Sequence, residues 1–241
     1  SMTGIASGKV LDLNMTEASD HVKMMNNMVS KTIGIKTAAR CTTVKPAGTT
    51  SLVLGTSSGI HAWHNKYYVR RMRVGKNEAI YSYLRVNHPE LLEDDYFRPH
   101  DTAVISIPQK APAGSITRKE STSELLDRVK KVATEWVKPG HRRGSNTHNV
   151  SATISIKDKG WFFAGEWMWN NREHYNGLSV LPYDGGTYVQ APFEDITKQK
   201  YDEMSKTLQG VDLTKVVELD DKTDLSGELA CAGGNCEITS L

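Results

Sequence analysis

Apolar residues recur at three- and four-residue steps in several segments of the chain, and this spacing predicts amphipathic helices. The first segment runs from residue 16 to 33 and ends at Gly34, a residue suited to the left-handed turn after a helix. Another begins at Ser121, which forms a capping-box pattern with Glu124. Further helices are predicted over residues 77–86, 161–171 and 197–208.

Short apolar or alternating runs between these helices predict strands. They cover residues 35–44, 67–74, 102–107, 149–156 and 178–181. Because helices separate most of these runs, the order favours an α/β fold with parallel strands over residues 1–219. After Leu219 the chain becomes acidic and polar, so residues 220–241 are predicted to form a flexible tail.

Composition and charge exclude several classes of protein. The 241 residues are 38% hydrophobic and 24% charged, which is typical of a soluble domain with an ordinary core. The net charge of +2 gives no argument for nucleic acid or a membrane surface as partner, and no run approaches the ~20 apolar residues that span a bilayer. Three cysteines make no disulfide framework, and the first residues do not resemble a signal peptide. We therefore expect a cytoplasmic protein.

A loop rich in glycine and hydroxyl groups is the first candidate for chemistry. It consists of Ala47, Gly48, Thr49, Thr50 and Ser51. Free amides at a helix start bind anions, glycine lets a phosphate approach the backbone, and hydroxyls donate further hydrogen bonds. The loop lacks the Gly-Lys-Ser/Thr of a Walker motif. A phosphate-binding loop and a capped strand-to-helix turn both remain open as interpretations.

A second candidate is the pair Cys231 and Cys236, which brackets two glycines near the end of the chain. A short flexible loop lets the two sulfurs meet and exchange with other thiols. Two cysteines lack the four ligands of a structural zinc site, so a redox pair is favoured over two incidental tail cysteines. Cys41 is interpreted as a buried strand cysteine.

The histidines show no metal-binding spacing, and no metal site is expected. Four of them lie near glycine-rich segments and are interpreted as capping or hydrogen-bonding residues: His61, His64, His141 and His148.

Four stretches, in a fixed order, resemble the class II (adenosylcobalamin-dependent) ribonucleotide reductases. The likeness is greatest to their monomeric branch, the ribonucleoside-triphosphate reductases. The stretches are residues 45–61, 141–153, 181–194 and 231–236. Four ordered motifs across nearly the whole chain are far more specific than any one of them.

The resemblance implies the carboxy-terminal part of a ten-stranded α/β barrel that converts ribonucleotides to 2′-deoxyribonucleotides by radical chemistry. In this family adenosylcobalamin generates a cysteine thiyl radical, and a cysteine pair then reduces the substrate. A carboxy-terminal dithiol restores that pair, and thioredoxin restores the dithiol. Carried over by position, residues 47–51 hold the substrate phosphates, and Cys231 and Cys236 form the shuttle dithiol. The residues that contact cobalamin are not identified.

The chain departs from the family at one decisive point. The thiyl cysteine belongs to a Pro-Cys-x-Glu motif before this region, and the sequence has no such motif. The resemblance therefore implies the amino-terminal half of the reductase as a partner, besides thioredoxin and the ribonucleotide. Half a barrel would also leave open strand edges.

Either a naturally split gene or a shortened chain explains this departure. Met2 as a start favours the split gene, and Ser1 is interpreted as a cloning remnant. Two alternatives are a non-catalytic nucleotide- or protein-binding barrel fragment and an unrelated phosphate-binding α/β protein with a redox-sensing tail.

Overall fold

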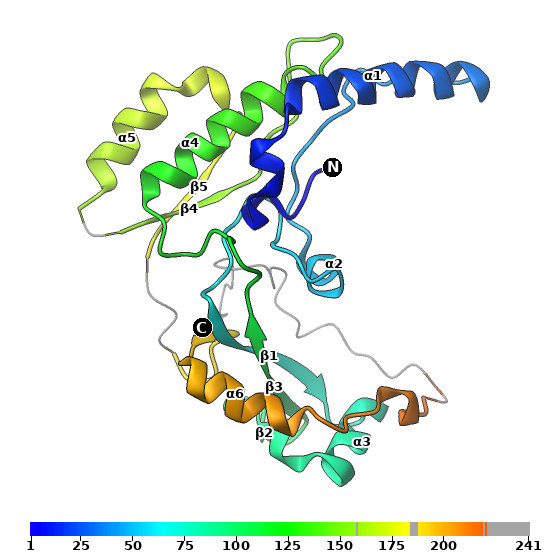
Figure 1. Cartoon of the computed structure of the whole chain (residues 1–241), viewed down its shortest axis with the longest axis vertical. Coiled ribbons are helices and arrows are strands. Elements are labelled where there is room, and N and C mark those ends of the chain that lie inside the picture. The colour runs from blue at the N-terminus through cyan, green and yellow to red at the C-terminus, as the bar shows by residue number, and fades with distance from the viewer. Residues whose placement is uncertain (158, 184–187, 219, 221–241) are drawn as a thin grey trace. The chain divides into compact units, whose positions relative to one another are not determined.

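The fold is that of a computed structural model, which describes residues 1–157, 159–183, 188–218 and 220. These residues divide into two compact units (Figure 1). Unit 1 comprises Ser1–Trp63 and Pro112–Tyr183. Unit 2 comprises His64–Ala111 and the described residues from 188 onward. The chain thus leaves unit 1 after Trp63 and returns to it at Pro112.

Unit 1 contains the longer helices. Helix α1 spans Met15–Thr32 and is capped by Asn14, whose side chain accepts a hydrogen bond from the Glu17 amide. Helix α4 spans Thr122–Val132, and the predicted capping box of Ser121 and Glu124 is confirmed. The other two helices of this unit are α2, Gly48–Val53, and α5, Trp161–Asn170.

The strands of unit 1 run parallel. Strand β4, Thr153–Ile156, pairs in parallel with β5, Ser179–Pro182. Val44 extends this arrangement through single parallel bridges to Met2 and Val150. Helices α4 and α5 pack together, and α4 also packs against β4 (Figure 1).

A shared apolar core holds unit 1 together. Alternate residues of β4 point inward, so Ile154 and Ile156 are buried. They join Leu126, Val129 and Val132, which recur at helical spacing along α4 and are fully buried. Each such side chain contributes roughly 1.5–3 kcal/mol of burial free energy, so the core fixes the position of the loops that leave these elements.

Unit 2 is built on an antiparallel sheet with strand order β2-β3-β1-β6. The strands are β1, Tyr67–Gly75; β2, Leu92–Asp94; β3, Thr102–Lys110; and β6, Phe193–Asp195. Helix α6, Lys198–Thr207, packs against β1 and β3, while α3, Ala79–Asn87, contributes Leu84 to a small core.

The mixed α/β class is confirmed, but the predicted parallel pairing is wrong for unit 2. β1 and β3 pair antiparallel along nine residues each, although a helix lies between them in sequence. The chain passes from β1 through α3 to β2, which pairs antiparallel with the outer side of β3. β1 and β2 are therefore parallel, and the crossover between them leaves one place that β3 fills antiparallel to both. A ten-stranded barrel stays a prediction.

The predicted strand over residues 35–44 is also wrong in extent, because only Arg40 and Val44 form bridges. Its polar groups bind carbonyls outside any strand instead: the Cys41 amide donates to Gly140, and the Thr42 hydroxyl donates to Trp136. Cys41 lies outside any strand and is half-buried, which corrects its interpretation as a buried strand cysteine.

No helix in the described part of the chain is long and apolar enough to cross a membrane. Cys231 and Cys236 lie outside the described residues, as does Leu219, the last residue before the predicted tail. The division of the chain into residues 1–219 and 220–241 therefore stays a prediction.

Candidate functional site

The predicted phosphate-binding loop forms the start of α2. The first hydrogen bond of this helix runs from the Ser51 amide to the Ala47 carbonyl, at 2.9 Å. The amides of residues 48–50 therefore have no acceptor within the helix. Of the described atoms, none lies within 4 Å of the position that a Cβ on Gly48 would occupy. The backbone is thus open to a ligand at this point.

The other members of the loop are engaged within it. The Ala47 amide donates to the Ser58 hydroxyl at 3.0 Å, and the Ser51 hydroxyl donates to the Gly48 carbonyl at 2.8 Å. Ser51 is also buried. Of the five predicted phosphate-binding residues, Gly48, Thr49 and Thr50 therefore present open amides, while the polar groups of Ala47 and Ser51 shape the turn.

A second glycine loop, residues 55–61, supports the first. A Cβ on Gly59 would lie 3.0 Å from the Pro46 nitrogen, and Gly59 has a φ of +57°, so this close approach favours glycine. The Gly59 amide donates to the Thr3 hydroxyl at 2.8 Å, and the Ser57 hydroxyl accepts from the Ala6 amide at 3.2 Å. The first residues of the chain thereby fasten the second loop.

His61 ends the second loop and connects it to β4. Its Nε2 accepts a hydrogen bond from the Thr153 amide at 3.0 Å. A backbone amide can only donate, so the ring proton belongs on Nδ1, which lies 3.2 Å from the Ser58 carbonyl. Burial lowers the pKa of His61, so the ring is held neutral. Protonation would remove the acceptor that Thr153 uses.

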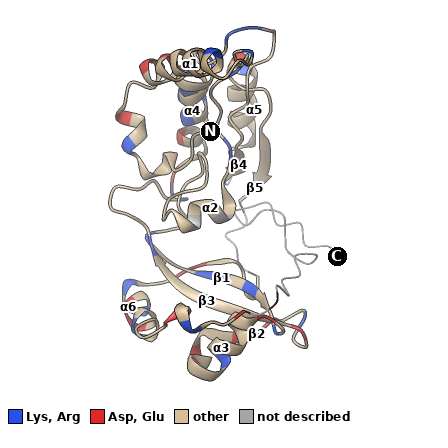
Figure 2. Cartoon of the chain, turned by 90° about the vertical axis from the view of Figure 1, so that its right-hand side faces the viewer, with Lys and Arg blue, Asp and Glu red and all other residues tan. Residues whose placement is uncertain are grey.

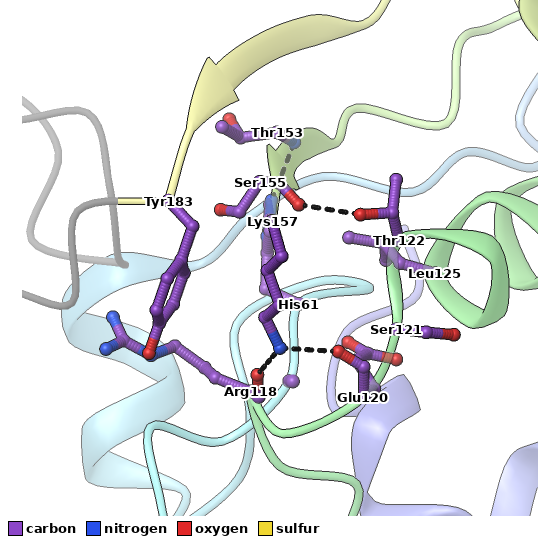
Figure 3. A pocket seen from close by; sticks show the side chains of 11 residues that line it. His61, Arg118, Glu120, Ser121, Thr122, Leu125, Thr153, Ser155, Lys157 and Tyr183 are labelled. Atoms are coloured by element: carbon purple, nitrogen blue, oxygen red, sulfur yellow. Dashed lines mark hydrogen bonds between the residues drawn. The ribbon is translucent and has the colours of Figure 1, made fainter. Parts of the chain in front are cut away.

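A cavity of about 70 Å³ lies beside His61 in unit 1 (Figure 3). Lys157 reaches into its wall, and its Nζ donates to the carbonyls of Arg118 at 2.5 Å and Glu120 at 2.7 Å. Lys157 and Arg118 also lie over the ring of Tyr183, at 5.1 Å and 5.6 Å from its centroid. Two cations in the lining favour an anionic group over a cationic one.

A buried ion pair between Arg128 and Glu120 lies next to this cavity and to the second glycine loop. Arg128 of α4 binds Glu120 through two hydrogen bonds of 2.5 Å and 2.8 Å, and the two side chains are 6% and 10% exposed. The same guanidinium donates to the Ile60 carbonyl at 3.3 Å. The pair therefore anchors the second loop to the core helix. The contact between Arg128 and Ile60 could not be predicted from the sequence, because residues so far apart along the chain leave no local pattern.

The histidines of the second resembling stretch have structural partners. His148 Nδ1 lies 2.9 Å from the Thr42 carbonyl, and His141 Nε2 lies 2.8 Å from the Gly144 carbonyl. Their interpretation as hydrogen-bonding residues is confirmed, as it is for His61. Within the described ranges, no group of three or more His, Cys, Asp or Glu side chains could hold a metal ion.

Comparisons of the sequence and of the structure with known proteins both find similarity to ribonucleotide reductases. No protein-family model matches the chain. The chain is similar to the adenosylcobalamin-dependent ribonucleoside-triphosphate reductases of Lactobacillus leichmannii, at 28% identity over 218 residues, and Euglena gracilis, at 25% over 226 residues. These matches cover 87% and 92% of this chain but only 28% and 30% of the relatives.

A solved structure of a B12-dependent (class II) ribonucleotide reductase has the same fold over the matched region. The TM-score is 0.69 at 22% sequence identity, over 88% of this chain and 33% of the other. The chain thus spans about a third or less of the length of the proteins it resembles.

Proposed function

We propose that this chain, which is partially homologous to the adenosylcobalamin-dependent class II ribonucleotide reductases, supplies one part of such an enzyme. The complete enzyme would convert ribonucleotides to 2′-deoxyribonucleotides. This part would contribute the loop that holds the substrate phosphates and the dithiol that passes reducing equivalents inward. The amino-terminal portion of the reductase would supply the remaining chemistry.

The observation that carries the proposal is the open helix start at residues 48–50. Three amides without helical acceptors can donate to phosphate oxygens, and Gly48 leaves room for the phosphate to reach them. Thr3, Ser57, Ser58 and Gly59 hold the loop in place through bonds to backbone groups. A preorganised loop binds with a smaller entropic cost than a mobile one.

The dithiol of Cys231 and Cys236 belongs to the proposal through the resemblance. Its two thiols would be oxidised to a disulfide while an active-site disulfide takes up the two electrons and two protons. Thioredoxin would then reduce the new disulfide by thiol exchange. The glycines between the two cysteines favour this ring closure.

Adenosylcobalamin, which the names of the relatives carry, would be bound by the complete enzyme. The cavity beside His61, at about 70 Å³, is far smaller than the roughly 300–1,000 Å³ of pockets for drug-sized ligands. The residues around it do not fit a corrinoid. We therefore assign no residue of this chain to the cofactor.

Ribonucleotide reduction with adenosylcobalamin and thioredoxin tests the proposal, using the chain alone and then with the amino-terminal portion of the reductase. We expect turnover only in the mixture. Gly48→Val should raise KM for the ribonucleotide about 10-fold or more, because the side chain blocks amides that make charge-assisted bonds. Gly177→Ala, at a position with no described atom within 4 Å of the added Cβ, is the control.

The Cys231→Ser variant separates the role of the dithiol from the role of the proposed phosphate-binding loop. It should lose thioredoxin-dependent turnover but keep nucleotide binding. Full thioredoxin-dependent turnover in this variant would disprove the shuttle role. Nucleotide binding by the chain with no turnover in any mixture would favour the second candidate, a non-catalytic binding fragment.

A further inference from the structure

Helix α1 has one covered side and one uncovered side. On the covered side Met15 and Ser30 are buried. The uncovered side carries Met25, Met28 and Val29, which are 40%, 54% and 50% exposed. α1 extends beyond the rest of unit 1 (Figure 1).

The uncovered side is mostly apolar. With 3.6 residues per turn, Ala18, Met25, Met28 and Val29 share one face of the helix. Glu17 and His21 also lie along this face, because about three and two turns separate them from Met28. The other charged residues of α1, coloured in Figure 2, lie on other parts of its circumference: Asp20, Lys23 and Lys31. Ile33 and Ile35, 60% and 61% exposed, prolong the apolar surface past the helix end.

The covered side fixes α1 at three points along its length. Ser19 donates to the Trp136 carbonyl at 2.9 Å, and Asn26 accepts from the Ala38 amide at 3.1 Å. Between them, the Lys23 carbonyl accepts a bond from Arg142. The apolar surface is therefore held in one orientation before any partner binds.

We infer that this surface (Ala18, Met25, Met28, Val29, Ile33 and Ile35) is where the amino-terminal portion of the reductase docks. The inference rests on the proposed function. A monomer rarely exposes a contiguous apolar patch without a partner, and methionine is enriched at protein interfaces. The covering partner must present a largely apolar face, since an unpaired charge against the methionines and Val29 would lose hydration.

The length of the relatives favours this occupant over a second copy of the chain. The match covers 28% of the Lactobacillus leichmannii enzyme, so most of that protein has no counterpart here. A helix that is anchored on one side and apolar on the other is what a domain interior leaves when part of it is missing. The flexible thioethers of Met25 and Met28 can adapt to the incoming surface.

Sedimentation velocity of the full chain mixed with the separately produced amino-terminal portion tests the inference. The test variant is Met25→Lys/Met28→Lys, which places two charges on the surface. The control is Thr16→Lys/Asn27→Lys, which adds the same charge to the same helix on another side. We expect the wild type and the control to bind alike and the test variant to bind on the order of 100-fold more weakly.

Each other outcome overturns the inference. Equal binding of the test variant would place the interface elsewhere while leaving the proposed function intact, since binding is measured without turnover. If the wild-type chain did not bind the amino-terminal portion of the reductase, that portion would be rejected as the partner of this surface. A wild-type homodimer that the test variant dissociates would assign the surface to a second copy. Circular dichroism at 222 nm checks that both variants keep α1 helical.

Discussion

An ion pair in unit 1 and an ion pair in unit 2 differ in how far they are buried. In unit 1 the Glu120–Arg128 pair is buried, and it binds the carboxyl end of the second glycine loop. In unit 2 the Arg98–Asp101 pair is 54% and 59% exposed and joins residues only three apart. Buried pairs lose much stability when one partner is removed, whereas exposed pairs contribute little. The buried pair therefore helps to hold the site of unit 1 in position, whereas the Arg98–Asp101 pair contributes little to the stability of unit 2.

Among the tests of this contrast between a buried and an exposed ion pair, the largest change in the free energy of unfolding is expected at Arg128. Arg128→Met leaves the Glu120 carboxylate buried without its partner, and we expect a loss of about 3–5 kcal/mol in the free energy of unfolding. Urea denaturation followed by tryptophan fluorescence measures it. The double variant Arg128→Met/Glu120→Gln should recover part of the loss. A single variant as stable as the wild type would break the comparison.

Gly140 gives the next largest effect. A Cβ at this position would lie 1.8 Å from the Thr42 hydroxyl oxygen, so Gly140→Ala must displace Thr42 from its bonds to the carbonyls of Trp136 and Val137. Overpacking of this kind costs about 1–3 kcal/mol. Thermal unfolding should show a lower Tm than for Gly177→Ala, which meets no described atom within 4 Å. Equal midpoints for the two variants would contradict the tight contact.

A smaller, pH-dependent effect is expected at His61. Because burial lowers the pKa of His61 from 6.5, the unfolded chain takes up this proton more readily than the folded chain. The contribution of neutral His61 to stability is therefore present above pH ~6.5 and declines as the pH falls towards the folded pKa, at up to about 1.4 kcal/mol per pH unit.

Urea titrations between pH 7.5 and 5 check this expectation. His61→Gln can still accept from the Thr153 amide but cannot titrate, so its stability should depend less on pH than that of the wild type. His174, whose pKa burial and nearby lysines also lower, gives the control variant His174→Gln. Because its side chain is only partly buried, we expect a smaller change in slope than for His61→Gln.

The smallest effect is expected in unit 2. Arg98 holds the pKa of Asp101 below its usual value through hydrogen bonds, but both side chains are open to water. Asp101→Asn should leave the urea midpoint at pH 7 nearly unchanged, at low and at high salt. A shift as large as that of Arg128→Met would show that the exposed pair of unit 2 stabilises the protein as much as the buried pair of unit 1.

Local signals made the helices predictable. The capping box of α4 and the periodicity of α1 lie within single segments. α1 begins and ends close to the predicted residues, and α4 begins directly after the predicted cap Ser121. The pairing of unit 2 depends on distant partners: Arg70 of β1 lies opposite Phe193 of the three-residue strand β6. No periodicity encodes such a pairing, so the antiparallel sheet could not be predicted from pattern alone.

The candidate site also has one part that local sequence indicates and another part that depends on residues far apart in the chain. Glycine and hydroxyl composition was enough to locate residues 47–51, because the chemistry of the loop is local. The supports of the loop were not predictable, since Thr3, His61 and Arg128 act across more than fifty residues of sequence. Their side chains meet only after the core of unit 1 has formed.

The interruption of unit 1 between Trp63 and Pro112 has a consequence for changes in the length of this segment. The Trp63 amide donates to the Ile116 carbonyl, and its carbonyl accepts from the Arg118 amide, so the two ends of the excursion are joined within unit 1. For unit 1 the residues between them act as a long loop, and doubling the length of a loop costs only about 0.6 kcal/mol in closure entropy. Lengthening, shortening or exchanging this segment therefore costs unit 1 little free energy of loop closure.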